Sequence, residues 1–193
     1  MALRGPERAK DCVAVPGLWE GRPAPVASRS PFAVLLTALL LLACAGVSVK
    51  NGEVNTDRTR YRFGDPGPQW RRVTLEDVDV SWVRDATGHT LSVDSTCRDY
   101  GDVPLQALLR QQLIGFTAAE RVDQREEMLD GRGALFTRWK AKLDGVPVEL
   151  GLWTLKKDGC IYDFTYTSPA GAYDVESGSL ARLVSGFQTE RVQ

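Results

Sequence analysis

The chain has 193 residues, with 24 Lys and Arg against 25 Asp and Glu, so its formal net charge is −1. Charges of both signs are interspersed and form no basic block, which excludes a typical nucleic-acid-binding protein. There is one histidine and no CxxC motif. A metal site built from several histidines and a zinc knuckle are therefore excluded, and we expect no cofactor and no metal.

Residues 1–30 mix both charges, contain many Pro and Gly residues and show no hydrophobic periodicity. Such a composition cannot bury enough apolar surface to fold. We therefore predict that this stretch is disordered.

An apolar run of twelve residues, Phe32–Ala43, follows and ends directly at Cys44. A helix of this length covers ~18 Å, well short of the ~30 Å hydrocarbon core of a bilayer. With Arg29 ahead of it, the run resembles a bacterial lipoprotein signal, with an h-region at 31–43 and the lipobox Leu41-Leu42-Ala43-Cys44. An uncleaved membrane anchor is the alternative, because the run can be extended to eighteen residues.

The resemblance implies cleavage after Ala43 and acylation of Cys44, which would attach the protein to a membrane through lipid. It implies a periplasm-facing protein of the bacterial cell envelope. Ala45 follows the cysteine where an inner-membrane retention signal has Asp, which favours the outer membrane. The n-region of such a signal is short, so residues 1–30 can also be interpreted as an extension upstream of a true start near Val26.

Two further cysteines, Cys97 and Cys160, lie in the region that would be exported. Disulfides persist in oxidising compartments, so an isolated pair there favours a disulfide. Two buried free thiols are the alternative. The lipid-bearing residue and the tether after it are placed at 44–60, and a single folded domain at 61–191.

The periodicity of the domain predicts two helices and six strands in the order ββ, α, ββββ, α. Apolar and polar residues alternate over 77–84, which predicts a half-buried strand. Over 146–156 both faces of the predicted strand are apolar, which predicts a central strand that is covered on both sides. The Asp-Gly pairs at 130, 144 and 158 are typical of tight turns between strands. The other expected strands are 91–97, 121–129, 133–143 and 160–167, and the expected helices are 104–115 and 176–187.

This order predicts an α+β fold, with an antiparallel sheet of about six strands and helices packed on its faces. The order of elements, the strand beginning Gly159-Cys160-Ile161-Tyr162-Asp163-Phe164 and the final helix ending Ser185-Gly186-Phe187 resemble the PsbP-like sandwich. The resemblance covers 61–190 and implies binding and assembly roles rather than a particular reaction.

No catalytic motif emerges from the residues. His89 falls in a predicted exposed turn, and Asp77 and Asp79 are interpreted as solvated side chains on one strand face. Aromatic side chains in the last strands are expected to form the core or to line an apolar cleft between the sheet and a helix. These residues are Trp139, Trp153, Tyr162, Phe164, Tyr166 and Tyr173.

Two functions follow as hypotheses. The first is a monomeric, non-enzymatic envelope lipoprotein that binds a protein partner or a small apolar ligand, in an accessory role within an envelope assembly. The second is an envelope enzyme whose carboxylates cluster in a cleft of the sheet.

Overall fold

The structure is a computed structural model that describes residues 47–50, 52–98 and 100–190, and the part from Val47 onward is one compact unit. The predictions for residues 1–30, for the h-region 31–43 and for the lipidation of Cys44 lie outside the described residues. No helix in the described part is both long and apolar enough to cross a membrane.

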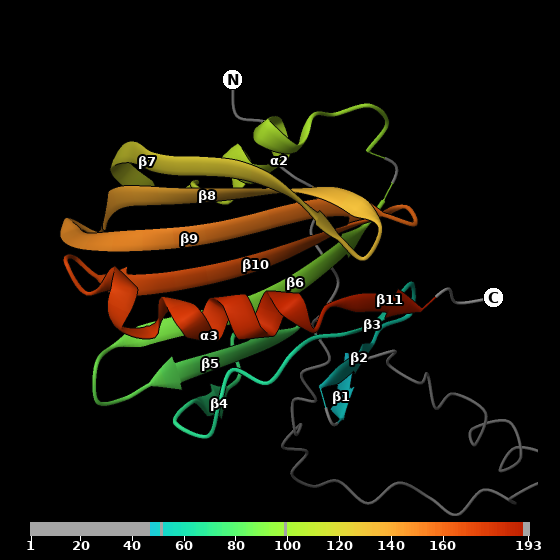
Figure 1. Cartoon of the computed structure of the whole chain (residues 1–193), viewed down its shortest axis with the longest axis horizontal. Coiled ribbons are helices and arrows are strands. Elements are labelled where there is room, and N and C mark those ends of the chain that lie inside the picture. Colours follow the sequence, from blue (N-terminus) through green and yellow to red (C-terminus); the bar gives the residue numbers. More distant parts are fainter. Residues whose placement is uncertain (1–46, 51, 99, 191–193) are drawn as a thin grey trace, which may run out of the picture. The chain divides into compact units, whose positions relative to one another are not determined.

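Seven antiparallel strands form the main sheet (Figure 1). Three Asp-Gly turns connect its long strands, and both residues of each turn have positive φ, as two-residue hairpin loops require. Across the sheet the order is β4 (Arg71–Val73), β5 (Val80–Arg84), β6 (His89–Cys97), β10 (Cys160–Pro169), β9 (Val146–Lys157), β8 (Arg132–Leu143) and β7 (Phe116–Leu129).

The two helices of the described part, α2 and α3, lie on opposite faces of this sheet. On β9, Trp153 and Leu155 share a core with α3 (Tyr173–Ser185), whereas Leu150 and Leu152 share a second core with α2 (Leu105–Gln111). The prediction of a central strand covered on both faces is therefore confirmed.

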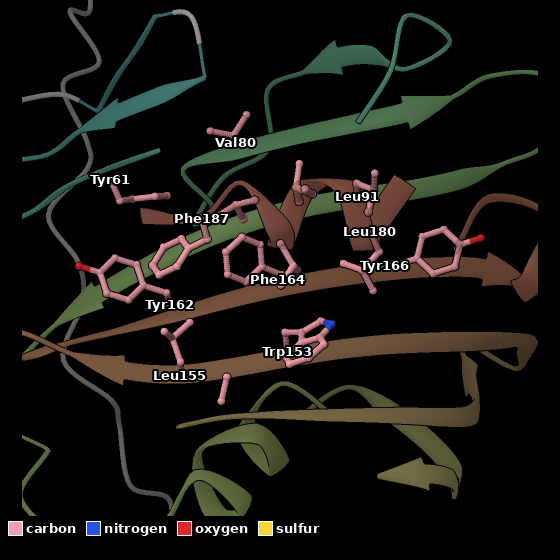
Figure 2. Close-up of a cluster of buried hydrophobic side chains, with 14 of the residues drawn as sticks. Tyr61, Val80, Leu91, Trp153, Leu155, Tyr162, Phe164, Tyr166, Leu180 and Phe187 are labelled. Atoms are coloured by element: carbon pink, nitrogen blue, oxygen red, sulfur yellow. The ribbon is translucent and has the colours of Figure 1, made fainter. Parts of the chain in front are cut away.

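The larger core lies on the α3 face and is rich in aromatic rings (Figure 2). The ring of Phe187 lies 5.0 Å from that of Tyr162 and 5.4 Å from that of Phe164, and Tyr61 meets Tyr162 edge-on at 5.2 Å. These centroid distances are those of favourable edge-to-face and tilted aromatic pairs. They join the end of α3 and the segment around Tyr61 to the main sheet.

A second sheet has four short strands, in the order β1 (Ser48–Lys50), β2 (Glu53–Asn55), β3 (Arg60–Arg62) and β11 (Gln188–Glu190). In the sequence, its first three strands come before the strands of the main sheet and its fourth comes after them. Val54 on β2 and Tyr61 on β3 are fully buried. Part of the segment that we assigned to a tether, 44–60, is thus folded. The fold is α+β in the broad sense, but it contains two sheets where one was expected, and the sheets dominate.

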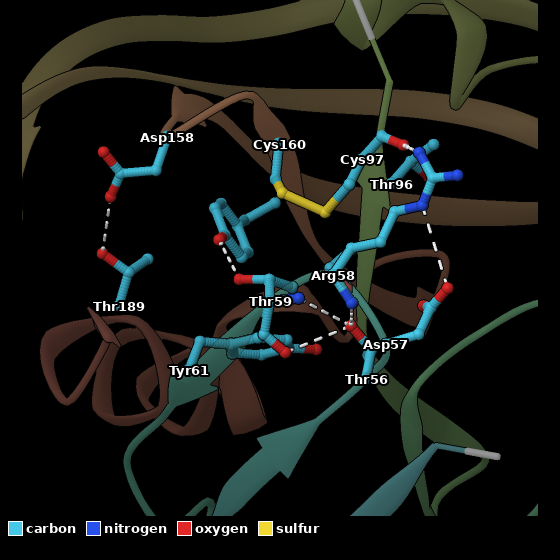
Figure 3. The surroundings of a disulfide bond; sticks show 12 residues. Thr56, Asp57, Arg58, Thr59, Tyr61, Thr96, Cys97, Asp158, Cys160 and Thr189 are labelled. Carbon is cyan, nitrogen blue, oxygen red and sulfur yellow. Dashed lines mark hydrogen bonds and ion pairs between the residues drawn. A yellow bond between two sulfur atoms is a disulfide. The ribbon is translucent and has the colours of Figure 1, made fainter. Parts of the chain in front are cut away.

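The disulfide between Cys97 and Cys160 joins β6 to β10 at directly opposed positions (Figure 3). The same corner holds a hydrogen bond of 2.6 Å between the hydroxyls of Thr59 and Tyr162, and Arg58 donates to the carbonyl of Cys97 at 3.0 Å. The disulfide therefore lies where the small sheet contacts the large one.

Candidate functional site

A groove of about 560 Å³ lies between α3 and the strands β7 and β8, and we call it the α3 groove. The helix reaches β9 and β10 and leaves the face of β7 and β8 open beside it. The residues that line the α3 groove come from β7, from the inner strands β8 and β9, and from α3. Those are Asp123, Arg125, Glu127 and Leu129 of β7; Phe136, Arg138 and Trp153 of the inner strands; and Tyr173, Asp174, Ser177, Gly178, Leu180, Ala181, Val184 and Ser185 of α3.

The floor of the α3 groove is apolar and aromatic. The rings of Phe136 and Trp153 lie 5.2 Å apart. Gly151 makes room for the helix above this floor, because a Cβ atom there would lie 2.4 Å from the hydroxyl of Tyr173. A larger residue at this position would push Tyr173, and with it the start of α3, away from the sheet.

Two arginines lie over aromatic rings of the α3 groove, Arg125 over the floor and Arg138 over Tyr173. The guanidinium carbon of Arg125 lies 3.9 Å from the ring centroid of Phe136 and 5.5 Å from that of Trp153. Arg138 lies 3.9 Å from the ring centroid of Tyr173. Cation–π contacts of this kind keep the floor dry while presenting a polar surface above it.

Carboxylates compensate the charge of both arginines. Arg125 pairs with Glu127 at 2.6 Å and with Asp123 at 3.3 Å. Arg138 pairs with the buried Glu149 at 2.7 Å and with Asp174 at 3.5 Å.

Burial alone would raise the pKa of Glu149, but hydrogen bonds from Arg138 and from the backbone N–H of Gly171 outweigh it and hold the pKa below its usual range. Glu149 therefore stays ionised as the partner of Arg138. The α3 groove thus has paired charges at its rim and offers apolar contact within.

The six aromatic residues that the sequence analysis singled out lie in the core, in the α3 groove or on the α2 face of the sheet. Tyr162, Phe164 and Tyr166 belong to the core, and Trp153 and Tyr173 both pack in the core and line the α3 groove. Trp139 lies on the opposite face, beside α2. The sequence identified these rings but missed Arg125 and Arg138, whose role depends on strand pairing that one sequence does not reveal.

His89 is not in an exposed turn. It is 1 % exposed and begins β6, where its ring stacks on Tyr166 and its two nitrogens lie within hydrogen-bond distance of Thr87 Oγ1 (2.7 Å) and the carbonyl of Ala172 (3.1 Å). His89 lies two residues before Leu91 on the same strand, so the alternation of the strand places both side chains on its buried face. The single histidine is a structural residue that links β6 to the start of α3.

The expectation for Asp79 is also corrected. Its carboxylate accepts hydrogen bonds from Tyr61 (2.7 Å) and from Ser95 (2.6 Å), so it is engaged rather than solvated. Burial first, and then the charge of Asp79, raise the pKa of Tyr61. The neighbouring Asp77 is exposed and adopts a positive φ of 63°.

One pair of carboxylates does meet on the α2 face. Asp94 and Asp163 are opposed across β6 and β10, and Asp163 accepts hydrogen bonds from Gln112 (2.7 Å) and from Thr154 (2.8 Å). Asp163 thus holds the residue that follows α2, and neither aspartate lines any of the three cavities of about 320, 380 and 560 Å³. Among the described residues no group of three His, Cys, Asp or Glu side chains is placed to hold a metal ion.

No family model and no curated protein matches the chain. Several solved structures are similar to it, among them the following three. LpqN of Mycobacterium tuberculosis, described as involved in cell envelope biogenesis, has 10% identity and a TM-score of 0.48 over 68% of this chain and 83% of that one. Cyanobacterial PsbP (CyanoP) from Synechocystis has 13% identity and a TM-score of 0.47 over 86% and 100%. Protein PA94 of Pseudomonas aeruginosa, a putative regulator of unknown function, has 9% identity and a TM-score of 0.46 over 77% and 98%.

Proposed function

We propose that this chain is a non-enzymatic lipoprotein of the bacterial cell envelope, anchored through lipid on Cys44, which binds an apolar segment of a partner protein in the α3 groove. The lipobox that ends at Cys44 supports the anchor. The observation that carries the binding role is the α3 groove itself, an open cavity of about 560 Å³ above a floor of aromatic rings.

The shape of the α3 groove favours a polypeptide segment over a compact ligand. Its lining on the helix runs from Tyr173 to Ser185. At 1.5 Å per residue this is ~18 Å, the length of about five residues of extended chain or three turns of helix. Its lining on β7 runs alongside, from Asp123 to Leu129.

The charges of the rim favour a segment without strong charge of its own. Both arginines already have carboxylate partners, so a charged ligand would have to compete with existing ion pairs. An apolar or aromatic side chain can instead stack on the guanidinium of Arg125, whose carbon lies 3.9 Å from the ring centroid of Phe136. We therefore propose recognition through apolar contact and shape.

Filling the groove provides the test. Gly178 lines it, and a Cβ atom at this position would meet only the end of the Arg182 side chain, at 3.9 Å. Gly178→Phe should therefore fold and occupy the groove. Val175→Phe is the matched control, since Val175 lies on the same helix, is 65 % exposed and lies outside the groove lining.

The readout is photocrosslinking in the native envelope, with a benzoylphenylalanine probe at Ser177 in the α3 groove. We expect a discrete crosslinked band that Gly178→Phe abolishes and Val175→Phe preserves. A band that survives Gly178→Phe, or the same band with the probe moved to the exposed Arg72 on β4, would contradict the proposal.

A further inference from the structure

A second cavity, of about 320 Å³, lies on the opposite face of the sheet between α2 and the strands β7 and β8, and we call it the α2 pocket. Its lining is made of Gln106, Leu109 and Arg110 from α2, Arg121 and Gln124 from β7, and Leu135, Thr137 and Trp139 from β8. Its volume is at the lower end of the range for small-molecule sites.

The floor of the α2 pocket is apolar. Leu109 and Leu135 are each 1 % exposed and belong to the core beneath α2. The polar groups at the floor satisfy each other, since the indole N–H of Trp139 donates to the hydroxyl of Thr137 at 2.7 Å. A ligand in this pocket would therefore meet hydrocarbon and an indole ring below it.

The rim of the α2 pocket carries two arginines, Arg110 and Arg121, that form no ion pair with a carboxylate of the described residues. Arg121 donates to the amide oxygen of Gln124 at 2.7 Å, and its guanidinium carbon lies 6.0 Å from the ring of Trp139. Arg110 donates to the backbone carbonyl of Gln106 at 3.3 Å. Neither makes an ion pair within the described part of the chain.

The α2 pocket and the α3 groove differ in whether their arginines are paired with carboxylates. Both arginines of the groove are paired with acidic residues, so that site has little preference for charge. The two arginines of the α2 pocket face a neutral surround of amides, a hydroxyl and apolar side chains. This pocket is therefore electrostatically complementary to an anion.

An irregularity in β7 creates this arrangement. The register against β8 shifts between Arg121 and Asp123, so Val122 is an inserted residue of a bulge. Arg121 pairs with Trp139 and Gln124 with Thr137, which places both side chains on the α2 face although they are three residues apart. Without the bulge, regular alternation would put them on opposite faces.

We infer that the α2 pocket binds a small organic anion, a carboxylate joined to an aromatic or branched aliphatic body. The guanidinium groups of Arg110 and Arg121 would hold the carboxylate, whose geometry they match, and the body would pack on Leu109, Leu135 and Trp139. This site is separate from the α3 groove and does not depend on the function proposed for it.

The test compares 2-naphthoate with its neutral amide as probes on the full ¹⁵N-labelled chain. Binding is followed through the indole N–H resonance of Trp139, assigned with Trp139→Phe. We expect the acid to shift this resonance in a saturable way and to bind at least about tenfold more tightly than the amide, the effect of one charge-assisted contact.

Arginine variants test which guanidinium groups bind the carboxylate of the probe. Arg110→Gln and Arg121→Gln should each weaken 2-naphthoate binding by about tenfold, whereas Arg72→Gln, which removes an exposed arginine from β4, should leave binding unchanged. Arg121→Lys should lose part of the affinity, because it keeps the charge but not the planar pair of donors. Unchanged Trp82 and Trp153 indole resonances would show that each variant is folded.

The inference is overturned if the amide binds as tightly as the acid, if Arg121→Gln behaves like Arg72→Gln, or if saturating 2-naphthoate leaves the Trp139 resonance unmoved. Crosslinking from Ser177 in the α3 groove should be unaffected by any of these variants. A failure of one proposal is therefore distinguishable from a failure of the other.

Discussion

Cys97 lies directly opposite Cys160 across β6 and β10, with their Cα atoms 4.0 Å apart, and their disulfide closes a sequence separation of 63 residues. The sequence predicted this pairing because an isolated pair of cysteines in an exported, oxidising compartment favours a disulfide. The structure adds that the bond lies beside Thr59, where the small sheet is attached (Figure 3). The hydroxyl of Thr59 is hydrogen-bonded to that of Tyr162 on β10.

The first prediction concerns this bond. A loop of this length gives ~4 kcal/mol of stabilisation by the chain-entropy model, and measured values are often lower. We therefore expect the double variant Cys97→Ala/Cys160→Ala to lose up to about 4 kcal/mol in urea denaturation. Adding a reductant should destabilise the parent chain and leave the double variant unchanged. An equal response of both would show that the cysteines are not joined in solution.

The second prediction concerns the segment before β3. A tether could be removed without loss of stability, but Val54 is fully buried in the core that it shares with the main sheet. A chain that starts at Val47 should therefore keep its stability, whereas one that starts at Arg58 should lose about 2 kcal/mol from the burial of Val54 alone. Thermal denaturation of the two chains measures the difference. Equal stability would show that residues 47–57 are dispensable.

The contrast between long and short strands explains what could be predicted. β8, β9 and β10 each run for ten residues or more, so their alternation and their Asp-Gly turns were visible in one sequence. β1, β2, β3, β4 and β11 have three residues each, too few to establish a period. Their existence depends on tertiary contacts, such as those of Val54 and Tyr61 with the main core.

The two cavities were less accessible to prediction than the strands. Trp139 and Trp153 were recognised as candidates, but the sequence placed them in one set. Pairing assigns them to opposite faces, Trp139 to the α2 pocket and Trp153 to the α3 groove. The arginines that distinguish the two sites lie on β7, β8 and α2. On β7, the bulge between Arg121 and Asp123 determines which face each following side chain joins.

The third prediction tests the anchor. Cys44→Ala removes the sulfur that the lipobox would use, so the variant should accumulate as an uncleaved precursor or leave the membrane fraction. Mass spectrometry of the parent protein extracted from membranes should show an acylated cysteine at the new N-terminus. Ser48→Ala is the control, since it changes an exposed side chain shortly after the signal and keeps the disulfide. A Cys44→Ala protein that is processed and anchored like the parent would exclude the lipoprotein hypothesis.

The last prediction concerns Asp163, which lies among Gln112, Thr154 and Asp94 beneath the end of α2. Burial raises the pKa of Asp163 to about 7, and the charge of Asp94 adds to this, while the hydrogen bond from Thr154 opposes it. In the unfolded chain the carboxyl has a pKa of about 3.9. The native state therefore retains a proton between about pH 4 and 7 that the unfolded state has released.

The sign follows from linkage. Where the native state binds more protons, stability falls as pH rises, so the contribution of Asp163 is present in full below about pH 4 and is lost as pH rises through about 7. Asp163→Asn keeps the acceptor for Gln112 and Thr154 but cannot ionise. Relative to the parent it should gain stability as pH rises from 4 to 8, on the order of 4 kcal/mol, since the pKa of Asp163 is raised by about three and each pKa unit corresponds to about 1.4 kcal/mol. Denaturation across this range measures the difference, and a pH-independent difference would show that Asp163 titrates normally.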